Sequence, residues 1–460
     1  MHDFPLLTAL ILVPFAGAAI AALVPRRHPE IARVVDVALD LTANFQTKTL
    51  SGAATLDILA VPGANEIVLD IRDLDIQDVT DAEGRPLRFV VGDNDAIKGQ
   101  PLTVYFPAFA ANERRKITIR SSPRPDAAAL QWLNPAQTAG GEKPYLFSQG
   151  QAILTRTWVP TQDSPGIRQT YSARIVAPED LTVVMSADHL TPQGEPVGNG
   201  MKAWRFRMNN PIPPYLIAIC VGDLAFAPFD GRTGVWTEPS RLAAARWELE
   251  PTAAMVDAAE KLYGPYRWGR YDLLVLPPSF PFGGMENPKL TFATPTIIAG
   301  DRSLVSLVAH ELAHSWSGNL VTNATWNDFW LNEGFTTYCE NRIMESLYGK
   351  TYADMLSLLG YADLEQNIHE LGDTSPLTKL KLDLRGLDPE EALTFVAYEK
   401  GKNLLRYLEE RLGRKEWDLF MRAYFDRFRF GTNTSEGFLG FLDSSFATMP
   451  RGIRDTVQRW

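Results

Sequence analysis

This sequence of 460 residues contains few cysteines and no cluster of basic residues. Its two cysteines, Cys220 and Cys339, lie in an apolar stretch and a helical one. That setting favours buried free thiols over one long-range disulfide, and it leaves the redox compartment open. No block of Lys or Arg occurs and the net charge is −10, which argues against a nucleic-acid-binding protein. With 45% hydrophobic residues, the chain can bury the cores of about two or three domains.

The N-terminal segment differs from the rest of the chain. Residues 4–25 contain no charged residue and are followed by Arg26 and Arg27. An apolar run of this length can cross a bilayer core of about 30 Å, and basic residues after it would stay in the cytoplasm. The prediction is a cytoplasmic protein with residues 4–25 as a candidate membrane tether. The alternative is an exported, periplasmic protein with a signal peptide, which Asp3 and the late basic residues disfavour.

Hydrophobic periodicity changes at about residue 222. Up to that point, alternation around Ile67 and stretches such as KITIR and PYLIAICVG predict strands. Beyond it, helices are predicted at 251–264, which ends at Gly264, and at about 303–317, 327–347 and 396–413. Between them, YDLLV predicts a strand. The fold class is therefore α+β, with an N-terminal segment (1–35), a β-rich domain (36–222) and a mainly helical domain (223–460).

One predicted helix has polar residues inside an apolar run, in the stretch VAHELAHSW, residues 308–316. His310 and His314 are four residues apart, so they lie on one face of a helix and can bind the same metal ion. Glu311 is offset by one residue, toward the place of a metal-bound water. The alternative is a buried histidine pair that only satisfies its hydrogen bonds.

An acidic residue in the next predicted helix extends this pattern. Glu333 follows His314 with eighteen residues between them, among large apolar side chains where a carboxylate is costly to bury without a cation. Two histidines and one glutamate leave the fourth position of zinc open, as in a catalytic site. Glu340, seven residues further, lies on nearly the same face and would orient a ligand, unless it is an ordinary solvated carboxylate.

Upstream of both helices is the stretch PSFPFGGMENPKL. Gly283 and Gly284 allow the backbone to approach a ligand, and their N–H groups can bind a peptide carbonyl. Glu286 offers a carboxylate that could receive a positively charged α-amine. Taken alone, GGMEN is more typical of a turn followed by a surface glutamate.

Together these motifs resemble those of a known family. GGMEN, HELAH and the glutamate of LNEG at this spacing are similar to the gluzincin (M1-type) aminopeptidases. ALQWLNPAQT, PYLFSQGQA and YDLLVLPPSFPFGGMENP are similar to their leukotriene A4 hydrolase branch. The resemblance covers about residues 36–445. It implies a saddle-like, β-rich N-terminal domain on a thermolysin-like catalytic domain with one zinc ion, which hydrolyses peptides that have a free N-terminal amine.

The resemblance also implies the residues that perform the chemistry. His310, His314 and Glu333 would bind the zinc ion, and Glu340 would support them. Glu311 would act as the general base. Tyr398 in VAYEKG would stabilise the oxyanion, although without the resemblance it would be an ordinary core aromatic.

A further set of residues is implied to bind the substrate. Glu286 matches the glutamate that holds the substrate α-amine, and Gln151 matches a glutamine beside that amine. Glu390 stands where the family has an acid lining the first side-chain pocket, so a preference for N-terminal Arg or Lys is predicted. The other implied substrate-binding residues are Gln149, Phe282, Gly283, Gly284 and Met285.

Two departures from the family pattern keep other functions open. Leu393 replaces a second tyrosine that serves the epoxide reaction in the leukotriene A4 hydrolase branch, which disfavours the alternative of a lipid-epoxide hydrolase. The family's C-terminal helical domain has no counterpart in the sequence. The other alternative is therefore a truncated, non-catalytic, membrane-tethered peptide-binding protein. Because every residue implied in catalysis is present, the zinc aminopeptidase is the preferred prediction.

Overall fold

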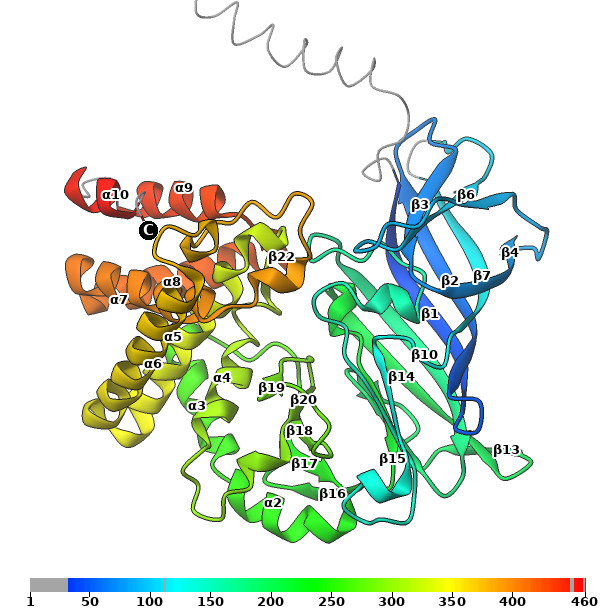
Figure 1. Ribbon diagram of the computed structural model, residues 1–460, viewed down its shortest axis with the longest axis horizontal. Helices are drawn as coiled ribbons and strands as arrows, with labels where there is room; N and C mark the ends of the chain where they lie inside the picture. The colour runs from blue at the N-terminus through cyan, green and yellow to red at the C-terminus, as the bar shows by residue number, and fades with distance from the viewer. Residues whose placement is uncertain (1–31, 111–112, 447–450, 458–459) are drawn as a thin grey trace, which may run out of the picture.

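The computed structural model describes residues 32–110, 113–446, 451–457 and 460. The candidate membrane tether at residues 4–25 lies outside this range. Within it, no helix is both long and apolar enough to span a bilayer. Both cysteines are buried free thiols, as expected. Figure 1 shows β-sheets on one side of the molecule, helices on the other and a further sheet between them, which agrees with the predicted α+β class.

The largest sheet has eight strands in the order β12-β14-β10-β1-β2-β7-β4, with β13 paired to β14. Strand β1 is antiparallel to β2 and parallel to β10. Buried and less buried residues alternate along β2, because one face of the sheet packs on the core. The strands are β1 (Ala32–Asn44), β2 (Thr49–Ala60), β4 (Leu74–Asp81), β7 (Arg114–Pro123), β10 (Gln169–Pro178), β12 (Asp188–His189), β13 (Glu195–Gly198) and β14 (Met201–Ile212).

Two smaller sheets complete the N-terminal part. The first consists of β3 (Glu66–Ile71), β6 (Gln100–Tyr105) and β5 (Phe89–Val91), and it contains the predicted alternating strand around Ile67. The second has the order β11 (Thr182–Met185), β15 (Ile219–Gly222), β9 (Tyr145–Ser148) and β8 (Leu130–Leu133). All residues of β9 and β15 are buried. Because β9 ends at Ser148, the following loop carries Gln149 and Gln151 into the interior.

A five-stranded sheet lies next along the chain, in the order β16-β17-β18-β20-β19. Its strands are β16 (Ala225–Pro228), β17 (Thr233–Thr237), β18 (Tyr271–Val275), β19 (Gly284–Met285) and β20 (Leu290–Ala293). The predicted strand YDLLV is β18, which pairs in parallel with β17 and β20 and is buried throughout. The short strand β19 is antiparallel to β20 at the edge of the sheet and carries two residues of the GGMEN motif.

Two helices, Leu242–Leu249 and Thr252–Tyr263, lie between β17 and β18 along the chain, and the others follow the sheet. A short pair of strands, β21 (Val321–Asn323) and β22 (Gly431–Asn433), lies among these later helices. The predicted helix at 251–264 is α3, which ends at Gly264 with φ 94°. The helix predicted at 303–317 is α4, which covers only Ser306–Ala313. The helix predicted at 396–413 begins with a π-helical turn, Val396–Lys400. The α-helices are α2 (Leu242–Leu249), α3 (Thr252–Tyr263), α4 (Ser306–Ala313), α5 (Trp330–Tyr348), α6 (Lys350–Leu371), α7 (Gly401–Leu412), α8 (Arg414–Phe428), α9 (Ser435–Ser445) and α10 (Arg451–Val457).

Helix α5 is the centre of the helical part, and most of its residues are buried. It crosses α7 with the two backbones in contact, since a Cβ atom at Gly334 would lie 2.7 Å from the Cα atom of Gly401. A side chain at either position would push the helices apart. These glycines therefore allow α5 and α7 to lie close together, and this contact helps to position the side chains of α5.

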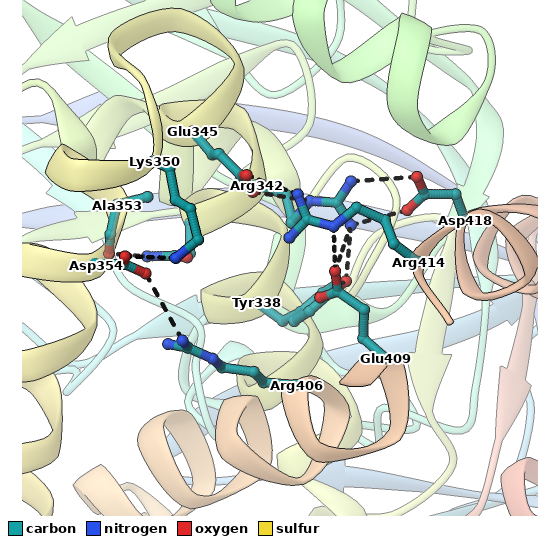
Figure 2. Close-up of polar contacts among 11 residues, drawn as sticks. Tyr338, Arg342, Glu345, Lys350, Ala353, Asp354, Arg406, Glu409, Arg414 and Asp418 are labelled. Atoms are coloured by element: carbon teal, nitrogen blue, oxygen red, sulfur yellow. Dashed lines mark hydrogen bonds and ion pairs between the residues drawn. The ribbon is translucent and has the colours of Figure 1, made fainter. Parts of the chain in front are cut away.

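The far face of α5 is held by ion pairs to α7 and α8 (Figure 2). Arg342 donates to both carboxylate oxygens of Asp418, at 2.8 and 3.2 Å, and to the Tyr338 hydroxyl at 2.9 Å. The Tyr338 hydroxyl donates in turn to Glu409, at 2.8 Å. Arg414 pairs with Glu345 at 2.6 Å. Because Arg342 and Glu409 are both buried, each charge depends on its partners for compensation.

Arg342→Met should destabilise the protein strongly, because it leaves the buried Glu409 carboxylate with less compensation. We expect the free energy of unfolding to fall by about 3 kcal/mol, measured by urea denaturation at pH 7. Arg406→Met is the matched control in the same cluster. Its guanidinium is 41% exposed and lies 3.2 Å from Glu410, so we expect a loss of about 1 kcal/mol or less. Equal losses in both variants would contradict the importance of burial here.

Candidate active site

Helices α4 and α5 bring His310, His314 and Glu333 together. The Nε2 atom of His310 lies 3.3 Å from Oε2 of Glu333, and the Nε2 atom of His314 lies 3.4 Å from the same oxygen. One ligand atom from each residue fits within a 4.8 Å group. All three side chains are mostly buried, so this carboxylate and these imidazoles must compensate much of each other's charge and polarity.

The outer nitrogens of the two imidazoles have their own partners. His310 Nδ1 lies 3.0 Å from Oε2 of Glu340, and His314 Nδ1 lies 3.0 Å from the carbonyl oxygen of Ser317. A carbonyl oxygen can only accept, so His314 carries its proton on Nδ1. The Nε2 lone pair of a neutral His314 then faces the Glu333 carboxylate, an arrangement that requires a cation between them. Two nitrogens and one oxygen are a donor set that fits zinc, and the hydrogen bonds at Nδ1 are typical of metal-binding histidines.

Charge in this cluster is consistent with a cation site. Burial lowers the pKa of His314, but the Glu333 carboxylate outweighs this effect and raises it to about 9. Burial raises the pKa of Glu333, but His314 and His310 lower it to about 2. Glu333 is therefore ionised at neutral pH, and without a metal ion a proton would take the place between it and the imidazoles.

Two further carboxylates lie beside this cluster. Glu286 and Glu311 form a second group with His314, again with ligand atoms within 4.8 Å of one another. Burial raises the pKa of Glu311 to about 7, against the effect of the histidines, and burial also raises the pKa of Glu286. Two buried like charges at this separation favour a bound cation. Strand β19 comes this close because a Cβ atom at Gly284 would lie 2.2 Å from Oε1 of Glu311.

A cavity of about 460 Å³ opens onto these residues. Its lining includes His310, His314, Glu333, Glu286, Glu311 and Glu340. Tyr398 lies on the π-helical turn, and its ring stacks on His310 with centroids 6.0 Å apart. Burial and the carboxylates of Glu333, Glu286 and Glu311 keep the pKa of Tyr398 well above its ordinary value. The other lining residues are Gln151, Phe282, Gly283, Gly284, Ser306, Leu307, Leu393 and Phe395.

Three residues of the predicted substrate-binding set do not line this cavity. Gln149 and Met285 are buried behind it, where the Gln149 amide nitrogen lies 3.2 Å from the Met285 sulfur. Glu390 is exposed on a short 3₁₀ helix, Pro389–Ala392, and accepts a hydrogen bond from the backbone of Ala152. Glu390 is thus next to the loop that carries Gln151, outside the lining of the cavity.

Several polar residues around the site had no clear signal in the sequence. Ser317 provides the carbonyl for His314, and the Thr336 hydroxyl lies 3.0 Å from the same nitrogen. Asn319 donates to the backbone carbonyl of Glu286 at 2.7 Å. Gly318, with φ 103°, allows this turn, because a Cβ atom there would lie 2.4 Å from Asn332. A side chain at Gly318 would therefore disturb the turn that brings Ser317 and Asn319 to the site.

Comparisons with known proteins agree with this geometry. The Peptidase M1 N-terminal domain model matches residues 28–216, and the Peptidase family M1 domain model matches residues 247–460. The chain is 42% identical to the Leukotriene A-4 hydrolase of Xenopus laevis, over 91% of this chain and 69% of that protein. It is 40% identical to the Aminopeptidase B of Mus musculus, over 92% of this chain and 68% of that protein.

The chain belongs to peptidase family M1. The solved structure of yeast LTA4 hydrolase in complex with bestatin has the same fold as this M1 chain, with a TM-score of 0.86 at 37% identity. The match covers 95% of this chain and 70% of the yeast chain. The predicted family, the α+β architecture and the enzyme class, a zinc-dependent aminopeptidase, are confirmed. The M1 chain spans about two thirds of the length of these relatives.

Glu340→Gln should weaken metal binding by this M1 chain without unfolding it, because the amide is a poorer acceptor for the Nδ1–H group of His310. We expect zinc affinity to fall by about 10-fold to 100-fold, measured by competition with a chromogenic chelator. Glu345→Gln, on the same helix but paired with Arg414, is the control and should leave the affinity unchanged. Unchanged affinity in Glu340→Gln would contradict this supporting role.

Proposed function

We propose that this chain is an aminopeptidase that holds one zinc ion on His310, His314 and Glu333 and removes the N-terminal residue of peptides. The observation that carries the proposal is the position of Glu286. This buried carboxylate lies in the same cavity as the metal-binding cluster, within the 4.8 Å group that also contains Glu311 and His314. A peptide with a charged α-amine would bring to it the cation that such a site favours.

The residues around the cluster supply the remaining chemistry. When bound, zinc would lower the pKa of a water molecule to about 7 and polarise the scissile carbonyl. Glu311, whose pKa is raised to about 7 by burial, is suited to accept the proton of that water and to give it to the leaving amine. The Tyr398 hydroxyl is protonated at neutral pH and can donate to the carbonyl oxygen as it becomes negative.

Glu286 and Gln151 would set the register of the substrate. Glu286 would pair with the α-amine, and the amide of Gln151, which lines the same cavity, would bind beside it. Only the first peptide bond would then reach the metal, so the enzyme would act as an exopeptidase. Epoxide hydrolysis is not favoured by any contact, because Leu393, at the position of the second tyrosine, lines the cavity without a hydroxyl group.

Glu286→Ala should abolish release of the N-terminal residue while zinc stays bound, because Glu286 is outside the metal-binding cluster. We expect kcat/KM for an alanyl amide to fall at least about 100-fold, because the substrate ammonium group loses its charged hydrogen-bond partner. Metal content is measured in parallel, and a zinc chelator should abolish the activity of the unmodified protein. Loss of zinc in Glu286→Ala would defeat the assigned role, as would hydrolysis by the chelated protein.

The predicted preference for an N-terminal Arg or Lys depends on Glu390. Because this carboxylate is exposed, its attraction to a basic side chain is worth about 1 kcal/mol at most, or roughly fivefold in kcat/KM for arginyl over alanyl amides. Glu390→Gln should remove this advantage and leave the alanyl rate unchanged. If alanyl and leucyl amides exceed the arginyl amide tenfold, the predicted preference is wrong.

A further inference from the structure

A buried tyrosine contacts Glu286 from the N-terminal part of the chain. Tyr215 lies on a short 3₁₀ helix, Pro214–Leu216, between β14 and β15, and is 1% exposed. Its hydroxyl donates to Oε1 of Glu286 at 3.2 Å. Its ring packs on Trp326, with centroids 5.3 Å apart. The ring is therefore held in place by packing, and the hydroxyl has a fixed direction toward the carboxylate.

A second hydrogen bond determines which way the tyrosine proton points. The side-chain nitrogen of Asn332 donates to the Tyr215 oxygen at 3.4 Å, and Asn332 is fully buried on α5, next to Glu333. Because the Tyr215 oxygen accepts from Asn332, its own proton is free for Glu286. A hydrogen bond donated to a carboxylate favours the ionised form. The chain Asn332–Tyr215–Glu286 thus limits the rotation of the Glu286 carboxylate.

The same segment also supports the loop that carries Gln151. A Cβ atom at Gly150 would lie 2.4 Å from the backbone oxygen of Tyr215, so the two backbones are in direct contact. The Thr155 hydroxyl donates to the carbonyl of Pro214 at 3.1 Å. Both groups that would receive the α-amine, Glu286 and Gln151, therefore rest against one short helix.

We propose that Tyr215 is a positioning residue that holds Glu286 in place for the α-amine of the ligand, and so determines the preference for ligands with a free amine. The inference rests on the proposed function, since it needs Glu286 to bind the amine. The hydrogen bonds of the Tyr215 hydroxyl go to Glu286 and Asn332, neither of which belongs to the proposed metal-binding set His310, His314 and Glu333. Its removal should act on amine recognition while leaving metal binding and the chemical step intact.

The test compares two zinc-binding inhibitors on the zinc-loaded full chain. Leucine hydroxamate has the α-amine, and 4-methylpentanehydroxamic acid is the same molecule without it. We expect Tyr215→Phe to raise the inhibition constant of leucine hydroxamate about fivefold, because the variant loses one 3.2 Å hydrogen bond to the Glu286 carboxylate. The constant of the second should stay within about twofold. For an alanyl amide, KM should rise by a similar factor and kcat should change little.

Tyr171→Phe is the matched control. Tyr171 is fully buried in β10, and its hydroxyl lies 2.9 Å from that of Ser186, which in turn donates to the backbone carbonyl of Leu216 at 2.7 Å. This control therefore removes a hydroxyl that supports the same short helix through Ser186, whereas only the Tyr215 hydroxyl donates to Glu286. Both variants remove one buried tyrosine hydroxyl, so they should lose similar stability. Only Tyr215→Phe should change the ratio between the two inhibitors, and zinc content should be equal in both.

The variant Glu286→Gln separates this inference from the proposed function. It should abolish the preference for leucine hydroxamate. If it does so and Tyr215→Phe keeps the preference of the unmodified protein, the inference about Tyr215 is overturned and the proposed function stands. If the unmodified protein has no preference for the amine, the role of Glu286 fails and the inference fails with it. Equal weakening of both inhibitors by Tyr215→Phe would show a general disturbance and would also overturn the inference.

Discussion

The contact between α4 and α5 is the constraint on which the site depends, because it presses one carboxylate against two imidazoles in an apolar interior. The Nδ1 bonds of His310 and His314 leave the Nε2 lone pairs facing Glu333. Such a group needs a metal ion or a proton between its atoms, and it keeps its geometry only if neither helix can move away. The close crossing of α5 and α7 and the ion pairs of Arg342 serve this purpose on the opposite face of α5 (Figure 2).

The N-terminal β-rich part belongs to the site as much as the helices do. It contributes Gln151 to the cavity and Tyr215 to the support of Glu286. Arg168, just before β10, donates to the backbone oxygen of Asn319 at 2.7 Å, and the Asn319 side chain donates to the backbone carbonyl of Glu286. Hydrogen bonds from the N-terminal part therefore reach Glu286 both directly and through Asn319.

Three buried carboxylates line one cavity, and together they favour positive charge there. Glu333 lies with His310 and His314 in a group that could hold a metal ion, while Glu286 and Glu311 lie beside it with pKa values raised by burial. A metal ion compensates the first. In the proposed function, a substrate ammonium group and a transferred proton would compensate the other two.

The sequence by itself determined the elements of the chemistry that are local. The four-residue spacing of His310 and His314 places both side chains on one face of a helix. The Glu333 carboxylate, among apolar residues, is costly to bury without a cation. Both expectations came from helical periodicity and the hydrophobic pattern alone. The strand YDLLV and the helix ending at Gly264 followed for the same local reason. Family resemblance added Glu286 and Tyr398, whose neighbours in sequence say little about their roles.

Only the tertiary structure decided which residues support these groups. PYLIAICVG predicts a strand, yet its first residues form a 3₁₀ helix that turns Tyr215 toward Glu286. Helices α6, α8 and α9 were not predicted, and the partners of Arg342 come from helices about seventy residues away along the chain. Glu390 was expected in the pocket and lies outside its lining. Such contacts depend on how distant segments pack, and a hydrogen bond between distant residues leaves no periodicity in the sequence that could reveal it.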